Sequence, residues 1–325
     1  MCAQMTKPIL LQIGNVTERM RVRFEAHFDV RIWFDLTDQD AFVTAYGADV
    51  LAIATDGHWG VPDQLLARLP NLRVVSSYGV GYDAIDADDA AARGILVSHT
   101  PNVLNDEVAD TAIMLWLATS RRLINADKWA RSGQWERDGA FALTRSVQKR
   151  QVGILGMGRI GETIAKRALA FNANIHYHAR SKKDNPYRYH SNISDLATAV
   201  DVIFVITPGG ASTHHLVNEE VMNALGPNGM LINVARGSVV DETALVAALQ
   251  DGRLGAAGLD VFEHEPAIPD ALKSMDNVLL TPHIGSASIE TRQAMGDLTC
   301  DNLEQYIQNG TVITPVPECK NLNDG

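Results

Sequence analysis

The chain has 325 residues, of which 46% are hydrophobic and 21% are charged, and its formal net charge is -11. This length fits two domains of ordinary size, and the apolar runs are too short to span a membrane. The negative charge disfavours nonspecific binding to nucleic acid. An anionic ligand would therefore have to be bound by local positive groups.

The amino-terminal segment and the cysteines bear on the compartment. Residues 1–14 contain a very short apolar run and no small-residue cleavage pattern, so they predict a first strand rather than a signal peptide. Cys2, Cys300 and Cys319 have neither metal-type nor redox-type spacing, which suits a reducing compartment. We expect a cytoplasmic protein and assign the cysteines no chemistry.

Short β-rich runs alternate with helical segments, such as residues 62–68, through the first hundred residues, a pattern typical of a parallel α/β unit. The runs cover residues 9–13, 30–34, 50–54, 74–77 and 95–97. Apolar periodicity then predicts a helix over residues 103–118. The stretch 121–150, rich in Trp and Arg, has no strand signal, and we call it the arm.

From residue 151 the alternation restarts and predicts a second, doubly wound parallel sheet that binds a nucleotide. Its six expected strands cover residues 151–155, 174–177, 202–206, 230–235, 256–260 and 278–280. The helical segment 290–309 follows this complete sheet and must pack elsewhere. We therefore expect an α/β protein with two Rossmann-like or flavodoxin-like domains and a cleft between them. The substrate-binding domain would combine residues 1–100 and 287–325, and the NAD(P)-binding domain would cover residues 101–286, with the arm.

The six residues Gly156-Met157-Gly158-Arg159-Ile160-Gly161 match the G-x-G-x-x-G motif of dinucleotide-binding proteins. The motif follows an apolar strand and opens a predicted helix, which is the context it requires. Gly156 permits a tight turn, Gly158 lets the backbone approach a pyrophosphate, and Gly161 allows close helix packing. The helix N-terminus, with Arg159 and Ile160, presents free N–H groups to the anion.

The next strand ends without the acid that usually binds the adenosine ribose about twenty residues after the glycines. Ala179 occupies this position, and Arg180, Ser181 and Lys182 follow it. A missing carboxylate beside a guanidinium is what the 2′-phosphate of NADP requires. NADP(H) is therefore the preferred cofactor and NAD(H) the alternative, while a solvated basic loop is the simpler interpretation.

Three polar residues follow later strands, at the edge where ligands bind in such sheets. They are Arg236, Glu265 and His283. A 2-keto acid needs an arginine for its carboxylate and carbonyl oxygen, a histidine that protonates this oxygen as hydride arrives, and a carboxylate that orients and charges the histidine. Each residue alone could be an ion-pair partner, a loop acid or a capping histidine, but their shared placement favours catalysis.

The motifs YGVGYDAID, GMGRIG, NVARGSVVDETAL, GLDVFEHEP and TPHIGSAS together resemble the D-isomer-specific 2-hydroxyacid dehydrogenase family over about residues 72–291. The resemblance implies that Arg236 binds the substrate carboxylate and carbonyl, and that His283 is the acid/base. It also implies that Glu265, and not Glu263, pairs with this histidine, and that Asp260 binds the nicotinamide carboxamide.

Further contacts are implied by the same resemblance. The backbone N–H groups of Val80 and Gly81 would cradle the substrate carboxylate. Cofactor contacts would come from Thr207 and Pro208 at the adenine and from the backbone of Val234 and Ala235. A glycine β-turn and simple strand ends are the alternatives. We expect the other histidines, including the adjacent His214 and His215, to be structural, because neighbouring side chains on an extended segment diverge.

The basic loop at Arg180, and the absence of a regulatory domain after residue 325, look most like the glyoxylate/hydroxypyruvate reductase branch. In this branch a tryptophan from the partner subunit's arm approaches the substrate, and Trp135 is the candidate, with arm packing alone as the alternative. We expect a homodimer that reduces a small 2-keto acid with NADPH to the D-2-hydroxy acid, without a metal. Alternatives are an NAD-linked dehydrogenase for D-lactate or a bulkier acid, and a non-catalytic nucleotide-sensing protein similar to the family's corepressors.

Overall fold

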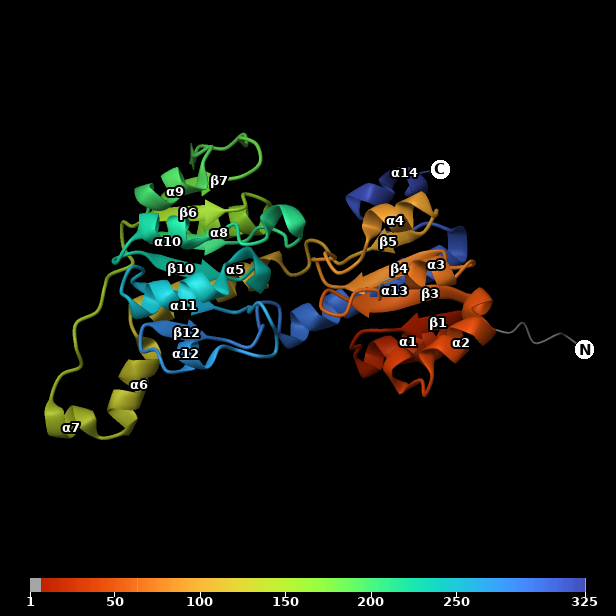
Figure 1. The fold of residues 1–325 in the computed structure, drawn as a ribbon, viewed down its shortest axis with the longest axis horizontal. Coiled ribbons are helices and arrows are strands. Elements are labelled where there is room, and N and C mark those ends of the chain that lie inside the picture. Colours follow the sequence, from red (N-terminus) through yellow and green to blue (C-terminus); the bar gives the residue numbers. More distant parts are fainter. Residues whose placement is uncertain (1–6, 63, 325) are drawn as a thin grey trace, which may run out of the picture. The chain divides into compact units, whose positions relative to one another are not determined.

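The computed structural model describes residues 7–62 and 64–324, and the chain forms two compact units (Figure 1). Unit 1 consists of two segments of the chain, one that ends at Leu104 and one that begins at Ile289. Unit 2 covers Asn105–Ser288 between them. The chain thus passes from one unit to the other at residues 104–105 and 288–289. No helix in the described ranges is both long and apolar enough to cross a bilayer.

Unit 1 is built on a five-stranded parallel sheet with the strand order β2-β1-β3-β4-β5. This is the flavodoxin-like order of a doubly wound sheet, as predicted. Four strands are fully buried or nearly so, and only β2 is more exposed, which explains their continuous apolar runs. The strands are β1 (Ile9–Gln12), β2 (Asp29–Ile32), β3 (Val50–Asp56), β4 (Val74–Tyr78) and β5 (Leu96–Ser98).

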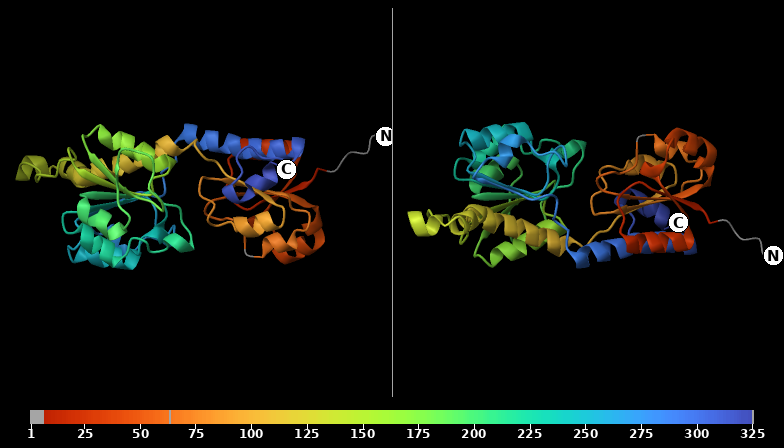
Figure 2. Two further views of the ribbon diagram at one scale, coloured as in Figure 1. Left: turned by 90° about the horizontal axis from the view of Figure 1, so that it is seen from above. Right: turned by 90° about the horizontal axis from the view of Figure 1, so that it is seen from below.

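Helices cover both faces of this sheet. Figure 2 shows α1 and α13 side by side on one face, and the shorter helices of the unit lie on the other. Within the expected helix 62–68 the structure shows the single helical turn α3 from Leu65, and residue 63 lies outside the described residues. The helices are α1 (Glu18–His27), α2 (Gln39–Tyr46), α3 (Leu65–Arg68), α4 (Ala87–Ala92), α13 (Ile289–Asn309) and α14 (Lys320–Asn323).

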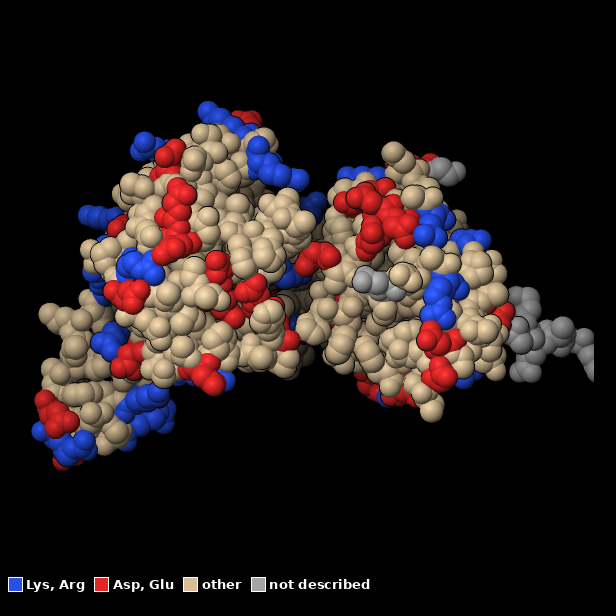
Figure 3. Space-filling view, viewed as in Figure 1, with Lys and Arg blue, Asp and Glu red and all other residues tan. Residues whose placement is uncertain are grey.

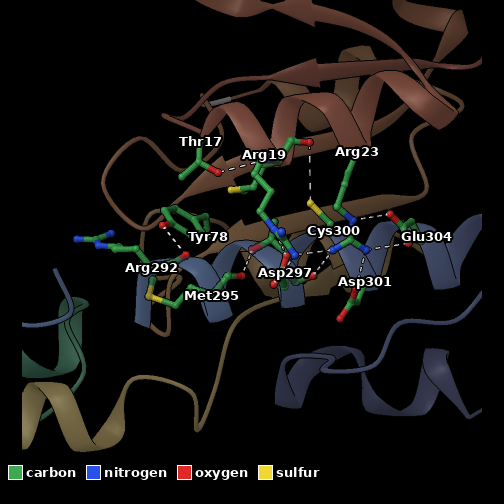
Figure 4. A network of polar contacts seen from close by, with 12 residues as sticks. Thr17, Arg19, Arg23, Tyr78, Arg292, Met295, Asp297, Cys300, Asp301 and Glu304 are labelled. Atoms are coloured by element: carbon green, nitrogen blue, oxygen red, sulfur yellow. Dashed lines mark hydrogen bonds and ion pairs between the residues drawn. The ribbon is translucent and has the colours of Figure 1, made fainter. Parts of the chain in front are cut away.

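A charged network fixes α13 to α1, although the two helices are far apart in the sequence (Figure 4). The guanidinium of Arg23 lies 2.6 Å from Asp301 and 2.8 Å from Glu304, and Arg19 lies 2.8 Å from Asp297. Arg23 is only 25% exposed, so its ion pairs are better shielded from solvent than ordinary surface pairs. These contacts explain why the last long helix belongs to unit 1.

Unit 2 is built on a seven-stranded parallel sheet with the order β12-β11-β10-β9-β6-β7-β8. The prediction of six strands was wrong by one, because β8 has only two residues, and its sequence lacks a β-branched run. The strands are β6 (Gln151–Leu155), β7 (Asn174–His178), β8 (Arg188–Tyr189), β9 (Val202–Val205), β10 (Met230–Asn233), β11 (Ala256–Leu259) and β12 (Val278–Leu280).

The helices of unit 2 form a layer on each face of the sheet (Figure 2). On one face, α5 packs against α8. The buried ring of Trp116 in α5 makes edge contacts with two rings, and its centroid lies 5.4 Å from that of Phe171 and 5.8 Å from that of Phe204. On the other face, α9, α10 and α11 enclose the second core. The helices are α5 (Asn105–Ser120), α8 (Arg159–Leu169), α9 (Ile193–Ala199), α10 (Glu219–Leu225), α11 (Glu242–Gln250) and α12 (Asp270–Lys273).

The arm leaves this sandwich and carries the short helices α6 (Leu123–Arg131) and α7 (Gln134–Asp138). Figure 1 shows both helices projecting away from the sheet of unit 2. Neither helix has a buried residue, and Leu143 beyond them is fully exposed at 101%. The arm therefore carries exposed apolar side chains that no core covers among the described residues.

Candidate active site

All predicted site residues of unit 2, apart from Trp135 in the arm, lie after the carboxyl ends of its parallel strands. The glycine turn follows β6, the basic loop follows β7, and Thr207 follows β9. Arg236, Glu265 and His283 follow β10, β11 and β12, which are adjacent in the sheet. Since all strands are parallel, these loops share one edge, and the chain reverses its winding beside β6, where doubly wound sheets bind ligands.

The glycine turn has the geometry that the motif predicts. Gly156 has a φ of +107°, and a Cβ atom there would lie 2.8 Å from the carbonyl oxygen of Ile206. A Cβ on Gly161 would lie 2.2 Å from the oxygen of Gly156, so close helix packing excludes any side chain. Gly158 instead faces open space and is the N-cap of α8 without a side-chain capping bond. The turn thus offers an anion an uncapped helix N-terminus that begins with Arg159 and Ile160.

Two tyrosines hold the basic loop after β7. The hydroxyl of Tyr177 accepts a hydrogen bond from the N–H of Lys183 at 2.8 Å, and Tyr189 donates to the carbonyl of Ala179. Arg180, Ser181 and Lys182 are exposed, and neither cation has an ion-pair partner among residues 7–62 and 64–324. Figure 3 shows cationic side chains at the tip of unit 2 where this loop lies. The loop can therefore receive an anion without losing an existing ion pair.

The loop that carries Arg236 is fixed by two residues that the sequence analysis did not single out. The side chain of Asn233, 1% exposed, donates to the carbonyl of Arg236 and accepts from the N–H of Ala235, each at 3.0 Å. A Cβ on Gly237 would lie 1.9 Å from the carbonyl carbon of Phe262. Close contact between the two loops therefore requires glycine at this position. A single Asn at the end of an apolar strand was the available sequence signal.

Glu265 and His283 form the pair that was predicted. The Oε2 atom of Glu265 lies 2.7 Å from Nδ1 of His283, and its Oε1 atom accepts from the N–H of Phe262 at 3.0 Å. Nδ1 is thus engaged, which leaves Nε2 as the nitrogen that can exchange a proton with a ligand. His283 has a φ of +53°, a conformation that costs energy for a non-glycine residue and is typical of functional sites.

Asp260 holds the loop in which His283 lies. Its carboxylate accepts hydrogen bonds from the Thr281 hydroxyl at 2.6 Å and from the N–H groups of Ile284 and Gly285 at 2.8 and 2.7 Å. Burial raises the pKa of Asp260, although these hydrogen bonds oppose the effect. The N–H of His283 also donates to the carbonyl of Asp260 at 2.8 Å. Asp260 therefore fixes the histidine loop, and its binding of a carboxamide stays a prediction.

The remaining expected cofactor contacts lie on the same edge of the sheet. Thr207 is half-buried and Pro208 exposed, and the carbonyl of Pro208 accepts from the Thr213 hydroxyl at 2.8 Å. Val234 and Ala235 are buried beside β10, at 7% and 6% exposure. Their position fits backbone contacts to a ligand better than side-chain contacts.

In unit 1, the loop after β4 presents two free amides. Among the described residues, no group accepts a hydrogen bond from the N–H of Val80 or Gly81. The loop is fixed by its carbonyls instead: that of Gly79 accepts from Thr100 at 2.8 Å, and that of Val80 lies 2.8 Å from Nδ1 of His99. The buried Ser77 hydroxyl beside them has no hydrogen-bond partner in the described ranges. These observations fit the predicted anion cradle.

The expectation that His214 and His215 diverge was wrong. Their ring centroids lie 3.9 Å apart, and both rings lie near Glu263. The cause is the left-handed backbone of His215, whose φ is +49°. Trp135, the candidate from the arm, is 69% exposed on α7.

The two doubly wound sheets, the glycine turn and the Arg, Glu and His side chains at one sheet edge define a nicotinamide-dependent oxidoreductase. Residues 113–285 match the D-isomer specific 2-hydroxyacid dehydrogenase, NAD binding domain. The chain belongs to the D-isomer specific 2-hydroxyacid dehydrogenase family.

Curated relatives and solved structures match nearly the whole chain. A glyoxylate/hydroxypyruvate reductase A of Arabidopsis thaliana is 43% identical and covers 94% of this chain and 98% of its own length. A hydroxyphenylpyruvate reductase of Plectranthus scutellarioides is 44% identical over 88% of this chain and 91% of its own length. An NADPH-dependent glyoxylate/hydroxypyruvate reductase of Sinorhizobium meliloti, solved with NADP and malonate, is 48% identical, with a TM-score of 0.91 over 96% of this chain and 98% of that chain.

Proposed function

We propose that this protein reduces a small 2-keto acid such as glyoxylate or hydroxypyruvate to the D-2-hydroxy acid with NADPH. The observation that carries the proposal is the 2.7 Å pair between Glu265 and His283 beside the Arg236 loop, on the sheet edge that also holds the glycine turn. The names of the Arabidopsis and Sinorhizobium relatives agree with this substrate class.

The reaction needs three groups from unit 2. The guanidinium of Arg236 would bind the carboxylate and carbonyl oxygens and so orient the keto group. His283 would donate the Nε2 proton to the carbonyl oxygen, while Glu265 keeps the ring in the required tautomer and orientation. The nicotinamide, when bound, supplies the hydride that the keto carbon accepts.

The cradle of unit 1 would bind the same class of substrate through its carboxylate. The N–H groups of Val80 and Gly81 have no hydrogen-bond acceptor in the described parts of the chain. A bound carboxylate would provide that acceptor. Because the net charge of the chain is -11, such local donors are needed to bind an acid.

The cofactor preference would be set by the loop after β7. Ala179 places no carboxylate beside the ribose, and the unpaired Arg180 and Lys182 offer a 2′-phosphate two cations. Ser181 adds a hydroxyl donor. NADP in the Sinorhizobium structure agrees with NADPH as the preferred cofactor of this chain.

NADPH oxidation followed with a panel of 2-keto acids tests the proposal. We expect turnover with glyoxylate or hydroxypyruvate. Binding of NADPH without turnover of any acid would contradict the proposal and would favour the nucleotide-sensing alternative.

A second candidate substrate class is a 2-keto acid with an aromatic side chain. The rings of Phe34 and Trp59 lie 4.6 Å apart and are 52% and 46% exposed. The loop of Trp59 passes close to the residue before the cradle, since a Cβ on Gly79 would lie 3.6 Å from the nitrogen of Gly57. The Plectranthus relative is named for hydroxyphenylpyruvate. A kcat/KM for hydroxyphenylpyruvate above that for hydroxypyruvate, lost on Trp59→Ala, would favour this class.

We also propose that the protein is a homodimer held by the arm, with Trp135 of the partner's arm near the substrate. The exposed apolar side chains of the arm support this assembly. The cytoplasm is the proposed compartment, since Cys300 and Cys319 are buried free thiols. Cys2 lies outside the described residues.

A further inference from the structure

A cluster of two histidines and a glutamate lies in unit 2 apart from the Glu265–His283 pair. His214 and His215 follow the short 3-10 helix Ala211–Thr213 after β9, and Glu263 lies in the loop after β11. The N–H of His215 donates to the carbonyl of Ser238 at 2.8 Å, which holds its left-handed backbone in place. One ligand atom from each of the three side chains lies within 4.8 Å of the other two.

The carboxylates at this cluster contact imidazoles and backbone but form no ion pair with a described Lys or Arg side chain. Nε2 of His215 lies 2.7 Å from Glu263 Oε1, and its Nδ1 lies 3.9 Å from Asp241 Oδ2. Glu242, only 9% exposed, accepts from the N–H of Glu263 at 3.3 Å. Among the described residues, no Lys or Arg forms an ion pair with Asp241, Glu242 or Glu263. Two carboxylates thus face His215 and a third lies behind Glu263, and a bound cation would balance part of their negative charge.

We propose that His214, His215 and Glu263 bind one divalent transition-metal ion of the Zn²⁺ class. Two imidazole nitrogens and one carboxylate oxygen are a donor set that Zn²⁺ accepts, whereas Mg²⁺ and Ca²⁺ prefer oxygen ligands alone. Water would supply the fourth ligand.

The arrangement needs little rearrangement to receive the ion. The metal would replace the proton between His215 and Glu263, and the two ligand atoms would move apart until each lies about 2.0–2.2 Å from the ion. His214 is exposed and makes no hydrogen bond to another described residue, so its ring can turn toward the site. Asp241, which faces the second nitrogen of His215, is placed to orient this ligand from outside.

Isothermal titration calorimetry with zinc chloride, on the full chain without a histidine tag, tests the site. We expect one Zn²⁺ per chain. His214→Ala and His215→Gln should each weaken binding by about tenfold or more, because even outer partners of a metal ligand are worth about 10- to 100-fold in affinity. The glutamine keeps a donor toward Glu263 and removes the imidazole.

The controls separate this site from other sources of zinc affinity. His27→Ala removes an exposed histidine at the end of α1 and should leave Zn²⁺ affinity unchanged. All variants are compared in a Cys2→Ser background, and their NADPH affinity reports an intact fold. Unchanged Zn²⁺ affinity in His214→Ala and His215→Gln, equal affinity for Mg²⁺, or no binding by the unmodified chain would overturn the proposal.

Discussion

At the scale of single residues, the site depends on one histidine whose ring is fixed by one carboxylate. Nδ1 of His283 is held 2.7 Å from Glu265, and the backbone N–H of the same histidine is bonded to the carbonyl of buried Asp260. Because both the ring and the backbone are fixed, Nε2 has a defined direction. This is the preorganisation that general acid catalysis requires.

His283→Ala is expected to lower kcat by about 10²- to 10⁴-fold, which is the usual contribution of a general acid. The affinity for NADPH should stay nearly the same, since the glycine turn and the basic loop are unchanged. Steady-state kinetics and cofactor fluorescence measure the two quantities. Near-normal kcat in this variant would remove His283 from the mechanism.

Arg236→Lys is expected to raise KM strongly for every 2-keto acid. A single ammonium group cannot replace a planar guanidinium that reaches a carboxylate and a carbonyl oxygen together. Arg253→Lys is a matched control, because Arg253 pairs with Glu219 on the surface at 2.8 Å. If the Arg236 and Arg253 variants have the same KM, Arg236 does not bind the substrate.

At the scale of elements, the turn after β7 decides which cofactor fits. The turn is anchored by Tyr177 and Tyr189, so Arg180 and Lys182 extend from a fixed backbone rather than a loose loop. A fixed backbone lowers the entropic cost of placing these cations around a phosphate.

We predict that NADPH is preferred over NADH by about ten- to hundred-fold in kcat/KM. This corresponds to the roughly 1.5–3 kcal/mol of a charge-assisted hydrogen bond. The double variant Ala179→Asp, Arg180→Ala should invert the preference, because it adds a ribose acceptor and removes a phosphate donor. An equal effect of Arg180→Ala on both cofactors would show that the loop does not recognise the 2′-phosphate.

A pair of histidines lies at the edge of the same sheet, with His176 in β7 and His190 directly after β8. Nδ1 of His176, 5% exposed, lies 2.9 Å from Nε2 of His190. Burial lowers the pKa of both histidines, and their mutual repulsion further lowers that of His176. Arg188 and His178 also lower the pKa of His190, whereas Asp195 raises it. The pair is therefore neutral in the folded protein at neutral pH.

Stability is expected to fall as the pH is lowered below about 6.5, the ordinary pKa of histidine. Between that value and the lower native pKa, the unfolded chain binds more protons than the folded chain, so the free energy of unfolding decreases with decreasing pH. His190→Gln should make the change in Tm between pH 7.5 and 5.5 smaller, and His27→Ala should not. An unchanged pH dependence in His190→Gln would exclude this pair as its source.

At the scale of the whole molecule, the arm leaves several apolar side chains exposed to solvent. Two exposed residues of α6, Leu123 at 54% and Ile124 at 48%, add to Trp135 and Leu143 as solvent-exposed apolar side chains. Exposed apolar side chains of this kind are typical of an interface between subunits, and a two-fold dimer would bury two arms together.

Light scattering should therefore give twice the mass of the chain at micromolar concentration. Leu143→Glu should shift the protein toward the monomer, because a charge would be buried in the interface. Arg131→Glu, at an exposed charged position of α6, serves as a comparison for charge alone. A monomeric unmodified protein would contradict the proposed assembly.

The sequence by itself determined the two parallel sheets, the glycine turn and the identity of the residues at the strand ends. These features depend on local patterns: apolar runs of strand length, a G-x-G-x-x-G motif after a strand, and polar residues that directly follow it. A short two-residue strand such as β8 has no such pattern, since pairing with β7 alone makes it a strand.

The tertiary structure decided which of these residues meet. Gly237 is required by the backbone of Phe262, and Asp260 fixes residues 281–285. His214 and His215 approach each other only because the backbone of His215 is left-handed and bonded to Ser238. Each of these contacts joins segments about twenty or more residues apart or depends on a single backbone angle, and neither kind of information is carried by local hydrophobic periodicity.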